Sequence, residues 1–279
     1  MGEEKRSFDS FVSFARHKMK IDAILTPEEL PALAKRDLRD VVCVVFDVLR
    51  ATSTIVTALQ HGAAAVIPVG EISEALAIKQ KQPDVLLGGE RDGVKIRAAQ
   101  NGGTDFDLGN SPREYLPQIV RGKTIVSTTT NGTRALRACA GAKIVLAASL
   151  LNLTATTEFI RRNKFENIVV VCAGTRENQA DEDVLAAGAL CELLEVGSSR
   201  RGDRTARRAV PTTLSDSAQI AQHAYAQAKS DMAAAVRNSE NARRLLAIAE
   251  LRDDVAFCLQ RNIFPLVARM EADGAIRRQ

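Results

Sequence analysis

The chain has 279 residues, 46% of them hydrophobic and 26% charged, a composition typical of a folded globular protein and not of a disordered one. Its net charge is only +4, and aromatic side chains make up 4% of the sequence, with no tryptophan. Proteins that bind single-stranded nucleic acid stack its bases on exposed aromatic rings, so we do not expect a nucleic-acid partner. No stretch approaches the roughly 20 apolar residues of a membrane-spanning helix, so we do not expect a membrane partner either.

The cysteines and the N-terminus indicate a reducing compartment. The five cysteines include no CxxC pair, and an odd number without that spacing fits neither a disulfide framework nor a zinc site. Residues 1–17 contain no apolar segment of signal-peptide length, and we treat them as an extension that precedes the folded domain. We therefore expect a cytoplasmic protein.

Short runs of valine and isoleucine alternate with helical patterns along the first two thirds of the chain. The expected strands cover residues 41–46, 64–69, 85–87, 123–126, 143–146 and 168–172. Continuous apolar strands that alternate with helices are typical of a parallel sheet buried on both faces. The sequence therefore predicts an α/β fold, a three-layer α/β/α arrangement with a mostly parallel sheet. We place it in a single domain over residues 18–265, with two lobes, 18–150 and 151–265, as the alternative.

The C-terminal part of the chain is expected to be mainly helical. From Ser215 onward these helices would either cover one face of the sheet or form a second lobe. Residues 266–279 are set apart as a C-terminal tail. Residues 197–208, with five arginines and one aspartate, read as an exposed loop. For the alanine-rich helices near 221–250, a homo-oligomer interface and packing within the chain both stay open.

Three of the expected strands end in segments rich in hydroxyl groups, glycine or charge. Asp47 and Arg50 follow the first, STTTNGT (127–133) follows another, and AGT (173–175) follows a third. In open parallel sheets, ligands bind at the carboxyl ends of the strands, where backbone N–H groups and helix N-termini favour anions. One such segment could simply cap a helix, but three of them favour an anion-binding pocket. Arg50 would suit a phosphate, a carboxylate or a sulfonate there.

Acidic residues near the same strand ends add a metal site to this prediction. Asp47 ends a buried strand, which is a costly position for a carboxylate without a cation or a chemical role. Glu90 follows strand 85–87, and Glu182 and Asp183 lie in the first turn of a helix. Carboxylate oxygens beside a phosphate site suit Mg²⁺. For Glu182 and Asp183, the simpler alternative is an interaction with the helix dipole alone.

The sequence lacks the signature motifs of several other enzyme classes. There is no GxxxxGK[ST] motif, no GxGxxG after a strand and no HExxH. The three histidines, His17, His61 and His223, lie away from the strand ends, which leaves a histidine triad without support. Asp47 is placed like the nucleophile of haloacid-dehalogenase phosphatases, but that signature requires a second aspartate two residues later, where Leu49 stands.

Five segments, read together, point to a known family. They are FDVLRATST (46–54), GGER (88–91), FDLGNSP (106–112), STTTNGT (127–133) and CAGT…EDVLAAG (172–188). Within residues 20–265 they resemble, in the same order, the motifs of the 2-phosphosulfolactate phosphatase family. The resemblance implies an α/β/α fold whose motifs converge on one pocket. It also implies a Mg²⁺-dependent phosphatase that converts 2-phospho-3-sulfolactate, the phosphate ester of a small acidic 2-hydroxy acid, to 3-sulfolactate and phosphate on the route to coenzyme M.

The resemblance also assigns residues to the site. It implies catalytic roles for Asp47, Arg50 and Glu90, and metal binding by Asp47, Glu90, Glu182 and Asp183. It implies substrate contacts by Thr52, Ser53, Arg91, Asn110, Thr128, Thr129, Asn131, Gly132 and Thr133. We expect Asp47 and one or two of the other carboxylates to hold Mg²⁺, while Arg50 and the hydroxyl-rich loop bind the phosphoryl group and the acidic tail. The sequence departs from the family pattern in the extra residues RAAQNGGTD (97–105) beside the pocket and in a longer 197–208 loop.

Two other functions stay open at this point. A phosphotransferase or mutase would use an acceptor other than water, and a phosphate-release assay with and without an acceptor would separate it from a phosphatase. A non-catalytic anion-binding or regulatory protein would be stabilised by phosphate esters without turnover. The carboxylates weigh against that alternative, because acidic residues near an anion do not help passive binding. A small phosphate ester is therefore the expected partner.

Overall fold

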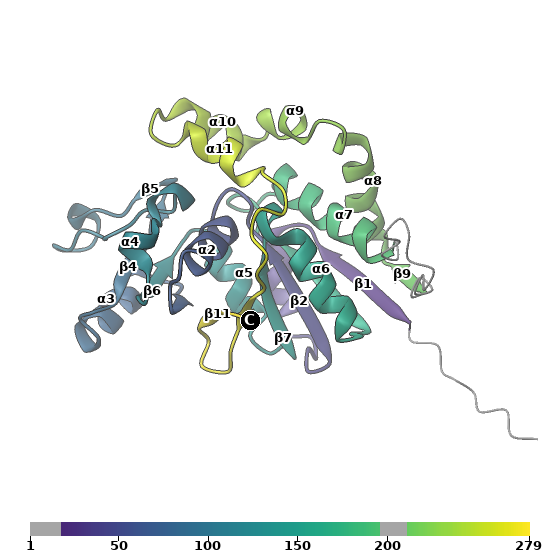
Figure 1. Cartoon of the computed structure of the whole chain (residues 1–279), viewed down its shortest axis with the longest axis horizontal. Helices are drawn as coiled ribbons and strands as arrows, with labels where there is room; N and C mark the ends of the chain where they lie inside the picture. Colours follow the sequence, from purple (N-terminus) through teal and green to yellow (C-terminus); the bar gives the residue numbers. More distant parts are fainter. Residues whose placement is uncertain (1–17, 196–210) are drawn as a thin grey trace, which may run out of the picture.

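The computed structural model describes residues 18–195 and 211–279, which form one mixed sheet of eleven strands with helices on both faces (Figure 1). The strand order is β5-β4-β6-β3-β11-β10-β7-β2-β8-β1-β9. The strands are β1 (Met19–Ile24), β2 (Val41–Phe46), β3 (Ala65–Pro68), β4 (Leu86–Arg91), β5 (Val94–Lys95), β6 (Thr124–Thr128), β7 (Ile144–Ala148), β8 (Asn167–Cys172), β9 (Thr212–Leu214), β10 (Ala268–Met270) and β11 (Ile276–Arg278). The predicted N-terminal extension, 1–17, and the arginine-rich segment, 197–208, lie outside the described residues.

The helices connect these strands and cover them. The α-helices are α1 (Leu30–Leu33), α2 (Ala51–Gln60), α3 (Ile72–Lys81), α4 (Pro117–Val120), α5 (Gly132–Ala138), α6 (Leu153–Arg162), α7 (Asp181–Glu195), α8 (Asp216–Ala228), α9 (Met232–Arg237), α10 (Glu240–Ala247) and α11 (Arg252–Cys258). Short 3₁₀ helices are η1 (Pro27–Glu29), η2 (Ala98–Gln100), η3 (Pro112–Glu114) and η4 (Leu150–Asn152). Among residues 18–195 and 211–279, none of the helices combines the length and the apolar character that crossing a bilayer requires.

Strand β2 shows why the sheet needs helices on both faces. Its buried side chains alternate between two hydrophobic cores, with Val42, Val44 and Phe46 in one and Cys43 and Val45 in the other. Helices α6, α7 and α8 cover the first core, and α1, α2 and α5 cover the second. A strand buried on both faces reads as an unbroken apolar run, as observed here. The predicted α/β fold with a mostly parallel sheet is thus confirmed.

The C-terminal residues are part of the sheet. β10 pairs antiparallel with β7 and with β11, and β11 pairs antiparallel with β3. These two strands therefore join a parallel block, β4-β6-β3, to a second parallel block, β7-β2-β8-β1-β9, so that one sheet runs through both of the alternative lobes. The prediction of a tail at 266–279 is corrected. Its two strands are only three residues long and contain arginine, so no apolar run marks them in the sequence.

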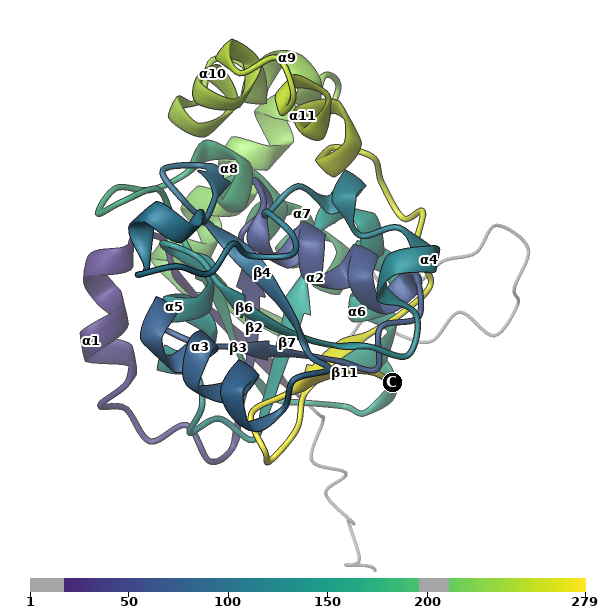
Figure 2. The same cartoon turned by 90° about the vertical axis from the view of Figure 1, so that its left-hand side faces the viewer.

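The C-terminal helices occupy two places. α8 packs along α7 over one face of the sheet, and α9, α10 and α11 lie together at one end of the molecule, at the top of Figures 1 and 2. We call residues 232–258, which contain these last three helices, the cap. α7 and α8 approach each other closely at Gly188, where an added methyl group would lie 2.0 Å from the Ala221 carbonyl oxygen. The helical C-terminal region thus both covers a sheet face and reaches the strand ends.

Candidate active site

Segments that are far apart in the sequence meet in one cavity beside the ends of β2, β4, β6 and β8. Its lining residues are Asp47, Leu49, Arg50, Glu90, Asp92, Gly93, Asn110, Thr130, Asn131, Gly174, Thr175, Arg176, Asn241 and Arg244. Five residues predicted for the site are therefore in the lining, namely Asp47, Arg50, Glu90, Asn110 and Asn131. The cap contributes a further wall through Asn241 and Arg244.

Asp47 lies at the centre of this arrangement, directly after β2. Its Oδ1 accepts a hydrogen bond from the Ala51 amide at 2.9 Å, and the Thr52 hydroxyl bonds both the amide and the carbonyl oxygen of Asp47. No described residue donates a hydrogen bond to Oδ2. Burial raises the pKa of Asp47 to about 7, and the negative charges of Glu90 and Glu182 add to this effect. The carboxylate is therefore held in place with one oxygen available to a cation.

Glu90 connects two loops at the cavity. Its Oε1 accepts hydrogen bonds from the amide and the hydroxyl of Thr130 at 2.8 and 3.0 Å, and its Oε2 accepts one from the Gly93 amide at 2.7 Å. The prediction that Glu90 follows a strand ending at residue 87 is corrected, because β4 continues to Arg91 through its antiparallel pairing with β5. Glu90 therefore lies within a strand, which limits its movement.

Glu182 and Asp183 lie behind the cavity wall, in the first turn of α7. Asp183 accepts hydrogen bonds from the Val48 amide at 2.8 Å and the Gly174 amide at 3.0 Å, so it joins the loops that follow β2 and β8. Glu182 is fully buried; its Oε1 accepts a hydrogen bond from Asn241 at 2.9 Å, and its Oε2 has no hydrogen-bond partner among the described residues. Burial raises the pKa of both carboxyl groups, and for Asp183 the charge of Asp47 adds to the effect. The two residues differ, since only Glu182 retains an unpaired oxygen.

These carboxylates fit a divalent cation that has additional ligands. Among the residues that the structure describes, no three acidic, histidine or cysteine side chains converge closely enough to hold a metal by themselves. Mg²⁺ is usually held by only one or two carboxylates, together with water and substrate phosphate oxygens. The free Oδ2 of Asp47 and the unpaired Oε2 of Glu182 suit that role. The residues therefore fit Mg²⁺, with Asp47 and either Glu90 or Glu182 as candidate ligands.

Most of the predicted hydroxyl residues support the cavity wall from behind. The Ser53 hydroxyl donates to the Val48 carbonyl oxygen at 2.8 Å, and Thr129 and Thr133 bond to each other's backbone. Gly132 makes room for Asp47, because a methyl group there would lie 2.5 Å from Oδ2. The predicted substrate-binding residues outside the lining are Thr52, Ser53, Arg91, Thr128, Thr129, Gly132 and Thr133. Their contacts with a substrate stay predictions.

Arg91 points away from the cavity, unlike its neighbour Glu90. Its guanidinium donates to the Thr128 hydroxyl at 3.0 Å and to the carbonyl oxygens of Glu90 and Gly70. A second hollow adjoins the cavity and shares Arg50, Gly93 and Asn110 with it. The first residue of the extra segment 97–105, Arg97, lies on the wall of this second hollow.

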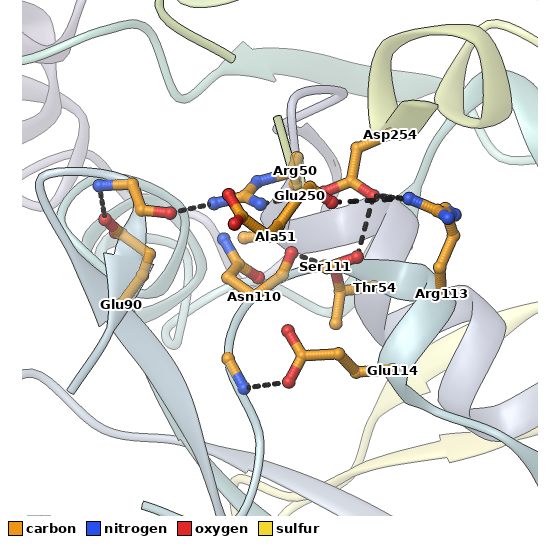
Figure 3. A network of polar contacts seen from close by, with 12 residues as sticks. Arg50, Ala51, Thr54, Glu90, Asn110, Ser111, Arg113, Glu114, Glu250 and Asp254 are labelled. Atoms are coloured by element: carbon orange, nitrogen blue, oxygen red, sulfur yellow. Dashed lines mark hydrogen bonds and ion pairs between the residues drawn. The ribbon is translucent and has the colours of Figure 1, made fainter. Parts of the chain in front are cut away.

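Six residues at the site were not singled out in the sequence, namely Asp92, Gly93, Arg176, Asn241, Arg244 and Asp254. Arg176 directly follows CAGT, so its position after a strand was a usable signal. Asn241 and Arg244 carry no motif. Asp254 forms an ion pair with Arg50, and Figure 3 shows the two side chains facing each other. The sequence signal for Asp254 is an acidic residue on the same helical face as the apolar Val255 and Cys258. Both of these residues are buried in the structure.

Comparisons with known proteins agree on one family. The model of a family described as 2-phosphosulpholactate phosphatase matches residues 24–273. A protein of Caldanaerobacter subterraneus subsp. tengcongensis, named probable 2-phosphosulfolactate phosphatase, is 36% identical over 90% of this chain and 96% of its own length. Proteins of the same name from Thermotoga maritima and Clostridium acetobutylicum are 40% and 34% identical, over 80% and 89% of this chain and 86% and 96% of their own lengths.

Proposed function

The chain belongs to the 2-phosphosulfolactate phosphatase family, and from this premise we propose that it hydrolyses 2-phosphosulfolactate to 3-sulfolactate and inorganic phosphate. The observation that carries the proposal is that one cavity holds both buried carboxylates, Asp47 and Glu90, and an arginine, Arg244, in its lining. An ester with phosphoryl, carboxylate and sulfonate groups needs both kinds of partner. The arginines bind its oxyanions directly, whereas the carboxylates reach them through a cation.

We assign the cation as Mg²⁺, held by Asp47 together with Glu90 or Glu182. When bound there, it would neutralise charge on the phosphoryl oxygens and orient the ester for attack by water. The chain's own contribution is to fix the surrounding groups. Glu90 ties the Thr130 and Gly93 backbones together, and Asn131 donates to the carbonyl oxygens of Ala173 and Arg176 at 3.0 and 2.8 Å. Groups fixed in this way need little rearrangement when the ester binds.

Arg50 is suited to bind the phosphoryl group. A guanidinium has five N–H donors, and in Arg50 one bonds Asp254 at 2.8 Å and another bonds the Gly93 carbonyl oxygen. The remaining N–H groups can donate to phosphoryl oxygens, while Asp254 balances the charge before substrate arrives. Arg50 therefore combines a fixed orientation with free donors.

We also propose that the protein acts in the cytoplasm, without a nucleic-acid or membrane partner. The five cysteines all lie within the described residues, and all are buried free thiols, which suits a reducing compartment. A homo-oligomer remains a proposal that light scattering on the purified full chain would test. The substrate partner is a small phosphate ester.

Phosphate release from 2-phosphosulfolactate tests the function. We expect activity that requires Mg²⁺, disappears with a chelator and falls by about 100-fold or more in Asp47→Asn. The control is Asp84→Asn, because Asp84 is exposed and lies outside the cavity lining. Phosphate appearing only when an alcohol acceptor is added would favour a phosphotransferase. Binding without turnover over a panel of phosphate esters would favour an anion-binding protein.

A further inference from the structure

Three arginines line the cavity, and they differ in how their charge is balanced. Arg50 is paired with Asp254, and Arg176 lies 3.8 Å from Oε1 of Glu240. Within the described residues, Arg244 has no carboxylate at ion-pair distance, and its Nε is buried without a hydrogen-bond partner. Leaving a buried charged donor unpaired is unfavourable, so an anion that filled this place would be bound favourably.

The neighbours of Arg244 hold it toward the cavity. Its Nη2 donates to the amide oxygen of Asn241 at 2.8 Å, and the amide nitrogen of Asn241 donates to Glu182 Oε1 at 2.9 Å and to the Thr175 hydroxyl. Asn241 is itself buried, with 5% of its surface exposed. An uncharged amide therefore orients the guanidinium without neutralising it.

Arg244 also lies close to the phosphoryl side of the cavity. A methyl group added at Gly93 would lie 3.6 Å from Nε of Arg244 and 4.0 Å from Nη2 of Arg50, so the two guanidinium groups flank the same short segment. Arg50 comes from the sheet side, where Asp47 lies, whereas Arg244 comes from α10 of the cap. A ligand with two anionic groups can contact both sides at once.

We propose that Arg244 binds the anionic group on the carbon chain of the substrate, a sulfonate or a carboxylate, and so selects esters with a second anion over simple phosphate monoesters. The inference rests on the proposed phosphatase function and adds a residue that determines specificity. The planar guanidinium offers paired N–H donors that match the oxygens of either group. The phosphoryl group then occupies the side of Asp47 and Arg50.

The test compares Arg244→Gln with wild type on three esters, 2-phosphosulfolactate, 2-phospholactate and p-nitrophenyl phosphate. We expect KM to rise about 10- to 100-fold for the esters that carry a second anion, with a smaller change in kcat. For p-nitrophenyl phosphate we expect kcat/KM to change by less than about threefold. Arg244→Lys should restore part of the loss, since it keeps the charge. Arg243→Gln is the matched control, because Arg243 is the exposed neighbour on the same helix.

The set of esters on which Arg244→Gln loses activity decides whether the proposal holds. A rise in KM for 2-phosphosulfolactate alone assigns Arg244 to the sulfonate, and a rise for 2-phospholactate as well assigns it to the carboxylate; both support the proposal. An equal loss on all three esters, or no loss on any, overturns it.

Calorimetric titration separates this proposal from the phosphatase function, because it needs no turnover. Arg244→Gln should weaken binding of 3-sulfolactate about 10-fold or more and leave binding of inorganic phosphate within about threefold. If wild type hydrolyses none of the esters, the phosphatase function fails while this titration still tests Arg244. Unchanged affinity of the variant for 3-sulfolactate, or no binding of 3-sulfolactate to wild type, overturns the role of Arg244.

Discussion

Arg50 and Asp254 lie 204 positions apart in the sequence and form a buried ion pair, with 2.8 Å between Nη1 and Oδ2. Their side chains are 2% and 0% exposed. Ser111 donates to the other Asp254 oxygen at 2.7 Å, and Arg113 lies 3.7 Å from that oxygen (Figure 3). Because Arg50 follows β2 and Asp254 belongs to α11, the pair connects the cap to the sheet beside the cavity.

Asp254→Asn is predicted to destabilise the protein and lower its activity. The change leaves Arg50 buried without a counter-ion, and breaking a buried pair from one side costs about 3–5 kcal/mol. Urea titration should show the loss in the free energy of unfolding, and kcat/KM for 2-phosphosulfolactate should fall in the fraction that remains folded. Asp253→Asn is the control: that side chain is 69% exposed, so we expect a change below about 0.5 kcal/mol. Wild-type stability in Asp254→Asn would contradict the proposed connection.

The sheet could be predicted where its strands are buried on both faces. β2, β7 and β8 form unbroken apolar runs, since helices cover both sides of them. β10 and β11 could not be predicted, because three-residue strands owe their place to pairing with distant strands and carry no periodic pattern. The positions of the cap helices could not be predicted either, because a helical sequence pattern does not indicate which surface the helix will contact.

Site residues could be predicted where they come shortly after the end of a buried strand. Asp47 and Asn131 were found in this way, because the next turn begins where the apolar run stops. The role of the Thr52 and Ser53 hydroxyl groups could not be predicted, because a hydroxyl at a strand end can bond either a ligand or the backbone. In the structure both donate to backbone carbonyl oxygens. Arg244 could not be predicted as a site residue, because it reaches the cavity only through the tertiary position of α10, which no local sequence pattern encodes.

The stability of the metal-free protein is predicted to fall as pH rises from about 4 to about 7. The carboxyl group of Asp47 has an ordinary pKa of 3.8 when unfolded and about 7 when folded. Below both values the group is protonated in both states; between them the unfolded chain ionises first, so the native state loses stability. A pKa difference of one corresponds to about 1.4 kcal/mol. Thermal melts in EDTA should show a shallower fall in Asp47→Asn than in wild type, with Asp84→Asn as the control, and identical profiles would contradict the assignment.

Added Mg²⁺ is predicted to stabilise the protein more at pH 8 than at pH 6. Metal binding requires ionised carboxylates, and the raised pKa of Asp47 leaves it largely protonated below pH 7. A ligand that binds only the native state stabilises it by RT ln(1 + [L]/Kd), so tighter Mg²⁺ binding gives a larger rise in Tm. The difference between melts with Mg²⁺ and with EDTA should therefore grow through neutral pH and shrink in Asp47→Asn. A Mg²⁺ effect of equal size in that variant would place the cation elsewhere.

Gly132→Ala is predicted to reduce activity. The added methyl group would lie 2.5 Å from both Asp47 Oδ2 and the Ala51 side chain, so the carboxylate must move. Displacing a catalytic group by about 1 Å can cost on the order of 100-fold in rate, so we expect kcat/KM for 2-phosphosulfolactate to fall about 10- to 100-fold. Gly141→Ala serves as the control, because nothing lies within 4 Å of its added methyl group. Full activity in Gly132→Ala would show that Asp47 need not hold its observed position.

Gly188→Ala is predicted to destabilise the protein although it places a better helix former inside α7. In an exposed helix this change would add about 0.5–1 kcal/mol of stability. Here the methyl group would lie 2.0 Å from the Ala221 carbonyl oxygen and 2.7 Å from Cβ of Tyr225, so α7 and α8 must separate. Overpacking of this kind costs about 1–3 kcal/mol, which exceeds the gain in helix propensity. Urea unfolding should show the loss, with Gly141→Ala as the control, and a Gly188→Ala variant more stable than wild type would mean that the two helices are not held this closely.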